Sequence, residues 1–306
     1  MNALDADIAE LRKAYGDLVA IDRRPEGMQY SATFRDGTPV TVIALARNLS
    51  DGLLDPAAFL SAMGRAAGVK HAALARPLSW GRSDAGLLHY AREVLTPGVL
   101  TPGELSAADI ATLGEELARG LAVAHHSGLS HGAITPWRIA RMHRGAVLDS
   151  FGVFAALVAG GVDSRQVATA LGEDSYNSPE VQRGTAPDER SDVYSLGAAL
   201  YVLLTGKPPF GGRTTSFVMA TVLSNRDMQE LNGVDDAAVA GIVEALLRAI
   251  EHAPEDRWPS ASAFADALAS GSPRTEMRSG AEQKRGWAKF AAIFRNAWFP
   301  TGRSRG

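Results

Sequence analysis

The sequence predicts an α+β protein in which a small β-rich part precedes a larger, mostly helical part. Two strand-like runs, 29–34 and 40–45, flank a hairpin turn signal at 35–38. From residue 106 onward, apolar residues recur mainly at helical spacing. The chain has 306 residues, of which 46% are hydrophobic and 21% are charged, so it can bury a large core. This length corresponds to about two globular units.

The expected elements begin with a helix over residues 3–16, because Leu4, Ile8, Leu11 and Tyr15 recur at helical spacing before a glycine. The other expected elements are strands at 18–21, 75–80 and 87–95 and helices at 55–68, 107–127, 191–205, 236–251 and 260–269. The resulting division is an N-terminal helix (1–16), a β-rich unit (17–95), a helical unit (96–270), and a linker with a basic tail (271–306).

Composition excludes several classes of function. The chain has no cysteine, which rules out disulfides, thiolate zinc sites, iron–sulfur clusters and cysteine nucleophiles. The first residues lack the pattern of a signal peptide, and no apolar run is long enough to predict a membrane-spanning helix. Residues 274–306 hold eight basic and two acidic residues, a charge of +6; the total is −3, which leaves −9 for residues 1–273. An acidic body does not favour nucleic acid as a partner.

The most specific motifs lie in the second half of the chain. They read GEDSYNSPE at 172–180, DERSDVYSLG at 188–197 and LLTGKPPF at 203–210. Shorter motifs precede and follow them: GLSHGAITP at 128–136, LDSFG at 148–152 and EDRWPS at 255–260. Together these resemble bacterial Hanks-type Ser/Thr protein kinases, over about residues 17–270. The resemblance implies a bilobal protein-kinase-like fold, with a small β-rich N-lobe and a larger helical C-lobe.

The same resemblance locates the groups that transfer phosphate in the family. These are a strand Lys, its Glu partner, a catalytic Asp, a metal-binding Asn and a second metal-binding Asp. The corresponding positions hold Ile43, Ala62, Ala133, Arg138 and Ser150. None of these side chains supplies the charge or the base that the family's chemistry needs. No catalytic residue is therefore expected to be intact, and no metal site is expected.

These losses do not depend on the exact alignment. No Lys lies between Lys13 and Lys70, and no acid lies between Asp55 and Asp84. Residues 124–148 contain no Asp, Glu or Asn. Asp149 adjoins the metal position, but in an extended segment it would point to the opposite face unless a local bulge turned it.

Residual contacts to a nucleotide are expected at five positions in the implied cleft: Gly27, Arg92, Glu93, Leu95 and Asp149. Gly27 is the one glycine that remains of the family's three-glycine loop, and the acid beside it would repel phosphate. The turn before Gly27 is therefore expected to be solvated. At the position before the hinge, Arg92 would fill the pocket or meet Glu93 or Asp149. Weak ATP binding stays open, whereas Mg²⁺ is not expected and no cofactor is required.

Other motif residues are structural in the family. Glu180 and Arg257 match a buried ion pair, and Asp192 matches an acid that accepts hydrogen bonds from the catalytic loop. The remaining structural residues by resemblance are His131, Phe151, Gly152 and Gly197.

The basic tail predicts an amphipathic helix with an aromatic stripe and flanking cations. The residues concerned are Trp287, Phe290, Phe294 and Trp298, with Lys289 and Arg295. Such a helix would dock on the chain's own C-lobe, in a partner's groove or on anionic lipid, and the sequence leaves these open.

The resemblance and the losses together indicate a catalytically inactive pseudokinase. Its expected role is that of a scaffold or allosteric regulator in bacterial Ser/Thr phosphorylation signalling. The expected partners are kinases or other signalling proteins. The expected location is cytoplasmic, with peripheral attachment at the inner face of the membrane as an option. Two alternatives remain: a divergent active kinase or other ATP-dependent phosphoryl or nucleotidyl transferase, and a peripheral membrane adaptor that acts through the tail.

Overall fold

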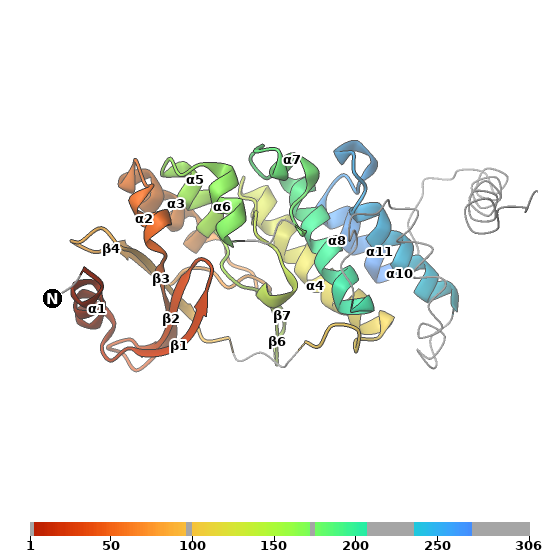
Figure 1. Cartoon of the computed structure of the whole chain (residues 1–306). Coiled ribbons are helices and arrows are strands. Elements are labelled where there is room, and N and C mark those ends of the chain that lie inside the picture. Colours follow the sequence, from red (N-terminus) through yellow and green to blue (C-terminus); the bar gives the residue numbers. More distant parts are fainter. Residues whose placement is uncertain (1–2, 96–99, 172–174, 207–235, 271–306) are drawn as a thin grey trace, which may run out of the picture.

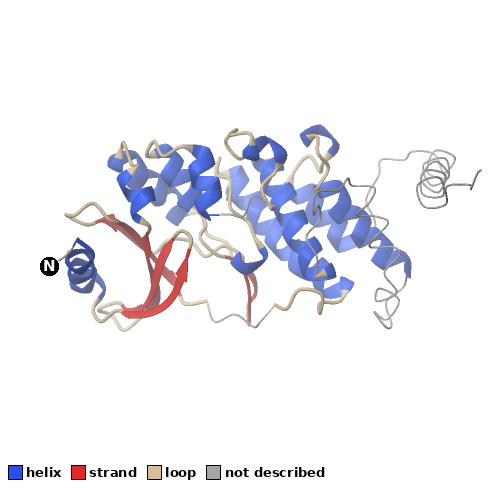
Figure 2. Cartoon of the chain, viewed as in Figure 1, coloured by secondary structure: helices blue, strands red, loops and turns tan. Residues whose placement is uncertain are grey.

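The computed structural model describes residues 3–95, 100–171, 175–206 and 236–270. An antiparallel sheet and its covering helices form one part, and a larger bundle of helices forms the other (Figures 1 and 2). This is the predicted fold class, a small β-rich lobe followed by a larger helical one.

The sheet has five antiparallel strands in the order β1-β2-β3-β5-β4. Their bounds are Val19–Arg24 (β1), Gly27–Thr33 (β2), Pro39–Leu45 (β3), Ser79–Arg82 (β4) and Leu88–Glu93 (β5). The predicted turn at 35–38 joins β2 to β3, where the amide of Phe34 donates to the Thr38 carbonyl at 2.8 Å. Apolar side chains of β3 alternate between two faces, both of which are buried.

Helix α1 (Ala3–Tyr15) covers one face of the sheet, where Leu11 and Tyr15 are buried. Polar contacts fix the helix at the turn before β5. The buried carboxylate of Asp7 accepts a hydrogen bond from Ser83 Oγ at 2.8 Å and pairs with Arg47. The predicted N-terminal helix is therefore present as part of the sheet lobe's core.

The other face of the sheet packs on α3 (Pro56–Gly68), which follows the short helix α2 (Arg47–Asp51). The carboxylate of Asp55 accepts from the Ala58 amide at 3.0 Å, and a proline occupies the first turn, so the start of α3 is well defined. Phe59 and Met63 of α3 are fully buried in the same apolar cluster as Tyr90 of β5.

The helical lobe is built around α4 (Ala107–His126) and α8 (Glu189–Thr205). A reciprocal capping box between Ser106 and Asp109 starts α4. Buried residues lie all around α8, which therefore forms the centre of this lobe. The surrounding elements are α7 (Pro179–Gln182), α10 (Asp236–Ala249), η3 (Pro254–Asp256) and α11 (Ala261–Ser270).

Several elements between α4 and α8 differ from the sequence analysis, which predicts nothing regular there. They are η1 (Pro136–Arg138), β6 (Ile139–Met142), β7 (Gly145–Leu148), α5 (Val153–Ala159) and α6 (Ser164–Leu171). The two strands have four residues each and the two helices at most eight, too short for a clear periodic signal. The strand expected at 75–80 is displaced to β4.

No helix within the described ranges is both long enough and apolar enough to cross a bilayer.

Candidate functional site

Charged side chains from both lobes meet where the sheet joins the helical lobe. Arg24 ends β1, Glu26 lies in the turn between β1 and β2, and Arg92 belongs to β5. From the helical lobe come Arg138 of η1, and Asp149 and Ser150 directly after β7. We call these six residues, Arg24, Glu26, Arg92, Arg138, Asp149 and Ser150, the interlobe cluster.

The shortest ion pair of the interlobe cluster joins Arg92 to Asp149. Both are buried, and Arg92 approaches the carboxylate with Nε at 2.5 Å and Nη2 at 2.9 Å. Arg24 adds a weaker contact to the same carboxylate at 3.4 Å. Burial alone would raise the pKa of the Asp149 carboxyl, but the charges of the neighbouring guanidiniums outweigh it and lower that pKa. Asp149 is therefore a neutralised partner of arginine rather than an available base or metal ligand.

Arg138 links the cluster to the segment that follows β7. Its side chain is 2% exposed and donates to the Leu171 carbonyl through Nε at 2.9 Å and Nη2 at 2.6 Å. Its Nη1 donates to Ser150 Oγ at 2.8 Å. One buried guanidinium thereby joins η1, the residue after Asp149, and the end of α6.

The turn before Gly27 is not the solvated turn that the sequence predicts, because Glu26 is 1% exposed. Its carboxylate lies 3.0 Å from Nη2 of Arg138, an ion pair that bridges the two lobes. Glu26 reaches this buried position because Gly27 lets strand β2 approach β3 closely. A Cβ on residue 27 would lie 2.0 Å from the Ala44 carbonyl oxygen. The remaining family glycine thus serves strand packing and places Glu26.

Asp149 does not face away from the site as an extended segment would require. Ser150 has a left-handed backbone (φ 65°), so both side chains reach members of the cluster. Tyr90 of β5 donates its hydroxyl to Ser150 Oγ at 3.1 Å. Burial and the charge of Asp149 raise the pKa of Tyr90, which keeps the phenol protonated as a donor. Tyr90 cannot be identified from the sequence, because a tyrosine in a buried strand carries no special signal.

The positions that the resemblance assigns to the family's strand Lys, helix Glu and catalytic Asp lie in an apolar core. Ile43, Ala62 and Ala133 are at most 2% exposed and belong to one apolar cluster with Phe154. Apolar packing in place of a buried ion pair can be neutral or stabilising. These three sites therefore contribute to stability and offer no chemistry.

Helix α5 packs against α3 and fills the space next to these positions. The approach is close, since a Cβ on Gly152 would lie 2.2 Å from the Cβ of Ala66 in α3. Helix α6 follows, and its last carbonyl accepts from Arg138. The segment after β7 is therefore built into the core and tied to the interlobe cluster.

The interlobe cluster does not fit a divalent metal. Both oxygens of Asp149 face arginine, and Ser150 Oγ accepts from Arg138 and Tyr90. Arg138 is the residue that the resemblance assigns to the family's metal-binding amide. Within the described ranges, no three His, Asp or Glu side chains form a group that could hold a metal ion.

The hinge region shows a similar departure. Arg92 Nη1 donates to the Glu93 carbonyl at 2.8 Å, so a guanidinium already uses that backbone acceptor. The Glu93 carboxylate points elsewhere and pairs with Arg144. Leu95 is half-buried at the end of a described range. A nucleotide bound in the manner of the family would therefore have to displace Arg92.

Two polar anchors hold the framework around the cluster, at positions that the resemblance indicates. The buried carboxylate of Asp192 accepts from the amides of His131 at 2.7 Å and Gly132 at 2.8 Å. It also contacts His125 Nε2 at 2.8 Å. Burial disfavours the charged form of His125, but the hydrogen bond and charge of Asp192 outweigh this and raise its pKa. His125 lies in the last turn of α4, where no motif marks it in the sequence.

A second anchor lies between α7 and the segment before α11. Arg257 donates to Glu180 through two nitrogens at 2.7 and 2.9 Å. Burial would raise the pKa of Glu180, but these bonds lower it to about 2.

Phe151 lies against His131 with ring centroids 6.2 Å apart. A Cβ on Gly197 would lie 2.6 Å from that of Ala249, which brings α8 close to α10.

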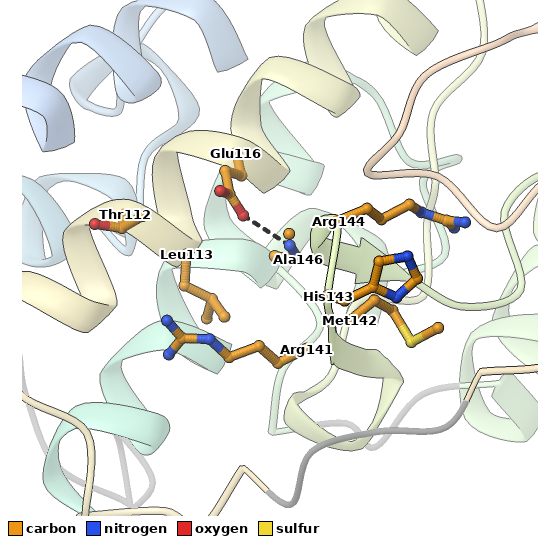
Figure 3. A pocket seen from close by; sticks show the side chains of 9 residues that line it. Thr112, Leu113, Glu116, Arg141, Met142, His143, Arg144 and Ala146 are labelled. Atoms are coloured by element: carbon orange, nitrogen blue, oxygen red, sulfur yellow. Dashed lines mark hydrogen bonds between the residues drawn. The ribbon is translucent and has the colours of Figure 1, made fainter.

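A pocket of about 440 Å³ lies elsewhere, between α4 and the β6–β7 hairpin (Figure 3). Its charged groups are already engaged: Arg141 pairs with Asp109, Arg144 with Glu93, and Glu116 accepts from the Ala146 amide at 2.7 Å. A second pocket of about 420 Å³ lies between the β1–β2 turn and α6. Neither pocket is lined by Arg92, Arg138 or Asp149.

The aromatic and basic residues singled out in the tail lie outside the described residues. They are Trp287, Phe290, Phe294, Trp298, Lys289 and Arg295.

Comparison with known proteins agrees with the fold. The family model for the protein kinase domain matches residues 87–265. The serine/threonine-protein kinase PknL of Mycobacterium tuberculosis is 34% identical over 181 residues, covering 58% of this chain and 45% of that protein. PknB of the same species is 30% identical over 206 residues, covering 64% of this chain and 33% of that protein. The chain therefore spans less than half the length of these relatives.

Solved structures show the same architecture. The kinase domain of Mycobacterium tuberculosis PknI gives a TM-score of 0.63 at 20% identity and covers 84% of this chain and 96% of its own. The pseudokinase domain of BIR2 gives a TM-score of 0.64 at 23% identity and covers 91% and 90%. At these identities the likeness concerns the fold alone. Because the family model matches more than half of its residues, the chain belongs to the protein kinase domain family.

Proposed function

We propose that this chain is a catalytically inactive member of its family and acts by binding other proteins in a Ser/Thr phosphorylation pathway. The observation that carries the proposal is the interlobe cluster. Arginine and carboxylate side chains pair with one another there, at the place where an active kinase holds nucleotide phosphates and metal ions.

Phosphoryl transfer depends on positioning and on neutralising phosphate charge. The positions of the strand Lys, its Glu partner and the catalytic Asp are apolar and buried. Asp149, the acid nearest to the metal position, is held by Arg92 and Arg24. The alternative of a divergent transferase would require Asp149 to leave both arginines.

The family's buried anchors support a role as a folded binding module. The pair of Glu180 with Arg257 and the hydrogen bonds to Asp192 stabilise the helical lobe independently of any reaction. The proposal places this module in the cytoplasm, with protein partners from the phosphorylation pathway. Their identity would come from capture experiments with the full chain.

A phosphotransfer assay tests the proposal. The purified full chain is incubated with γ-labelled ATP, Mg²⁺ or Mn²⁺, and a generic protein substrate, with the PknB kinase domain as a positive control. We expect no incorporation above that of a heat-denatured sample. Metal-dependent incorporation that Asp149→Ala abolishes would overturn the proposal and restore the transferase alternative.

A second candidate function is that of a membrane adaptor, favoured by the charge of +6 on residues 274–306. Co-sedimentation with vesicles of anionic lipid distinguishes it. We expect binding that is lost when residues 280–306 are removed, if the tail is a lipid anchor. Absence of sedimentation at low salt removes this candidate and leaves protein partners.

A further inference from the structure

The pocket between α4 and the β6–β7 hairpin has no part in the proposed function (Figure 3). Its volume of about 440 Å³ is large enough to take an aromatic side chain. Leu113 and Ala146 are buried parts of its wall, and Met142 is half-buried beside them. Arg141 and Arg144 line its more exposed part. Guanidinium and thioether groups both make favourable contacts with aromatic rings, so this lining suits an aromatic occupant.

The last described helix, α11, packs along α4 and leads toward the pocket. Asp266 of α11 pairs with Arg119 of α4 at 3.1 Å. Two residues later, Leu268 lies over Gly114, where a Cβ would be 2.7 Å from the Cδ1 of that leucine. The two helices therefore run antiparallel, and α11 ends at Ser270 near the start of α4.

The chain that follows α11 is long enough to enter the pocket. Thr112, which lines the pocket, lies two residues before Gly114, so the chain leaves α11 close by. Residues 271–306 remain, and the aromatic stripe of the tail begins at Trp287. The sixteen residues 271–286 span at most about 55 Å when extended. The aromatic side chains of the tail are therefore within reach of the pocket.

Charge around the pocket complements that of the tail. The charged side chains at the pocket and on the adjoining turn of α4 are five carboxylates, Glu93, Asp109, Glu115, Glu116 and Asp266, and three guanidiniums, Arg119, Arg141 and Arg144. Each of these arginines already pairs with an acid, whereas Glu116 accepts only a backbone amide. With histidine counted as neutral, two negative charges are in excess. Residues 274–306 carry +6 and can compensate this excess.

We propose that the tail of the same chain, residues 286–299, occupies the pocket between α4 and the β6–β7 hairpin. At least one side chain of the aromatic stripe fills the pocket, and Lys289 and Arg295 pair with the surrounding carboxylates. Arg138 directly precedes this hairpin and Asp149 directly follows it, so the seated tail also braces the segment that carries these two residues. The contact does not involve phosphate, so it holds whether or not the chain transfers phosphate. A tail seated in this pocket is not available to a lipid surface.

A photo-cross-linking experiment tests where the tail lies. The full chain carries p-benzoylphenylalanine in place of Phe290, is irradiated, and is digested for mass spectrometry. We expect cross-links from residue 290 to residues 112–116 or 141–146. Mixing with an equal amount of isotope-labelled chain separates contacts within one chain from contacts between copies, and we expect the former.

Hydrogen exchange of the full chain tests whether the pocket holds the tail. Met142→Lys replaces an apolar lining residue with a cation that repels the tail. We expect this change to speed exchange of residues 286–299 at least about ten-fold. Leu54→Lys is the matched control, because Leu54 is an 81% exposed apolar residue of the other lobe. It should leave exchange of the tail unchanged. The second variant, Trp287→Ala with Trp298→Ala, alters only the tail and should speed its exchange if Met142→Lys does not fold.

Three results would overturn the proposal. The first is exchange of residues 286–299 in the wild-type chain at the rate of the free peptide 280–306. The second is exchange and cross-linking that Met142→Lys leaves unchanged, or cross-links that join different copies only. The third is protection of the tail that appears only when vesicles of anionic lipid are added, which would assign the tail to a membrane surface.

Discussion

Replacing the acid that pairs with Arg92 tests the interlobe cluster most directly. Asp149→Asn keeps the shape of the side chain but removes its charge. Arg92 would then lose its carboxylate partner, whereas Arg138 keeps Glu26 and Arg24 keeps the exposed Asp22. The reverse change, Arg92→Met, removes one cation and leaves Asp149 with its 3.4 Å contact to Arg24. The two single variants therefore differ in the charge that they leave buried.

The size of the effect follows from burial. Arg92 and Asp149 are both buried and joined by two short contacts. Removing one member of such a pair costs about 3–5 kcal/mol, because the other charge stays without compensation. We expect Asp149→Asn to lose about that amount of unfolding free energy. Arg92→Met should lose less, because Asp149 keeps its contact with Arg24.

The assay is equilibrium unfolding in urea at neutral pH for wild type, both single variants and the double variant. The double variant should be more stable than Asp149→Asn alone. In the single variant the Arg92 guanidinium stays buried without its carboxylate, whereas the double variant has no such unpaired charge. Circular dichroism of the folded variants checks that the fold is retained. A loss below about 1 kcal/mol for Asp149→Asn, or a larger loss for Arg92→Met, would contradict the interpretation of the cluster.

Three further predictions concern the framework. Glu180 has a pKa of about 2 against an ordinary value of 4.5, so its ion pair stabilises the fold above pH 4.5. That stability should be lost as pH falls toward 2, and Glu180→Gln should flatten an acid titration of the melting temperature over this range. The pKa of His125 is raised above 6.5, so its contribution is present below pH 6.5 and should be lost as pH rises through the higher folded value. His125→Gln should remove that slope from melting temperatures measured between pH 6 and 9. Gly152→Ala should cost about 2–5 kcal/mol in urea unfolding, from a 2.2 Å clash with Ala66 and a φ of +86°. The control Gly184→Ala, with a positive φ but no neighbour within 4 Å, should cost only the backbone strain of about 1–2 kcal/mol.

The elements that the sequence predicts well are those with long periodic patterns. The N-terminal helix and the helices starting near residues 56, 107, 189 and 261 appear within a few residues of their expected bounds. Their apolar repeats span several turns, and caps such as Asp55 and Ser106 mark their starts. Of the family motifs, residues 189–197 lie in α8, whereas 128–136, 148–152 and 255–260 lie in loops and at the ends of short elements. These motifs predict the fold through resemblance rather than through periodicity.

The interior of the site is harder to predict because its contacts join distant segments. Glu26 and Arg138 are 112 positions apart in the numbering, and nothing local indicates that they meet. An acid next to Gly27 suggests repulsion of phosphate when the turn is considered alone. Glu26 is buried because it pairs with Arg138. From the sequence alone, Arg138 indicates only that a metal-binding residue is missing. The resemblance identifies which charged residues of the family are missing. The fold determines which carboxylate each arginine of the interlobe cluster pairs with.

The interlobe cluster also bears on motion between the lobes. In an active kinase the lobes bind and release nucleotide at each turnover, so contacts across the site must break and re-form in every cycle. Here Arg92 of the sheet holds Asp149 of the helical lobe, and Glu26 holds Arg138, which is also bonded to the end of α6. Opening the lobes would expose or unpair several buried charges at once. A site of this kind favours one closed arrangement of the lobes, which supports the proposed role in partner binding over the transferase alternative.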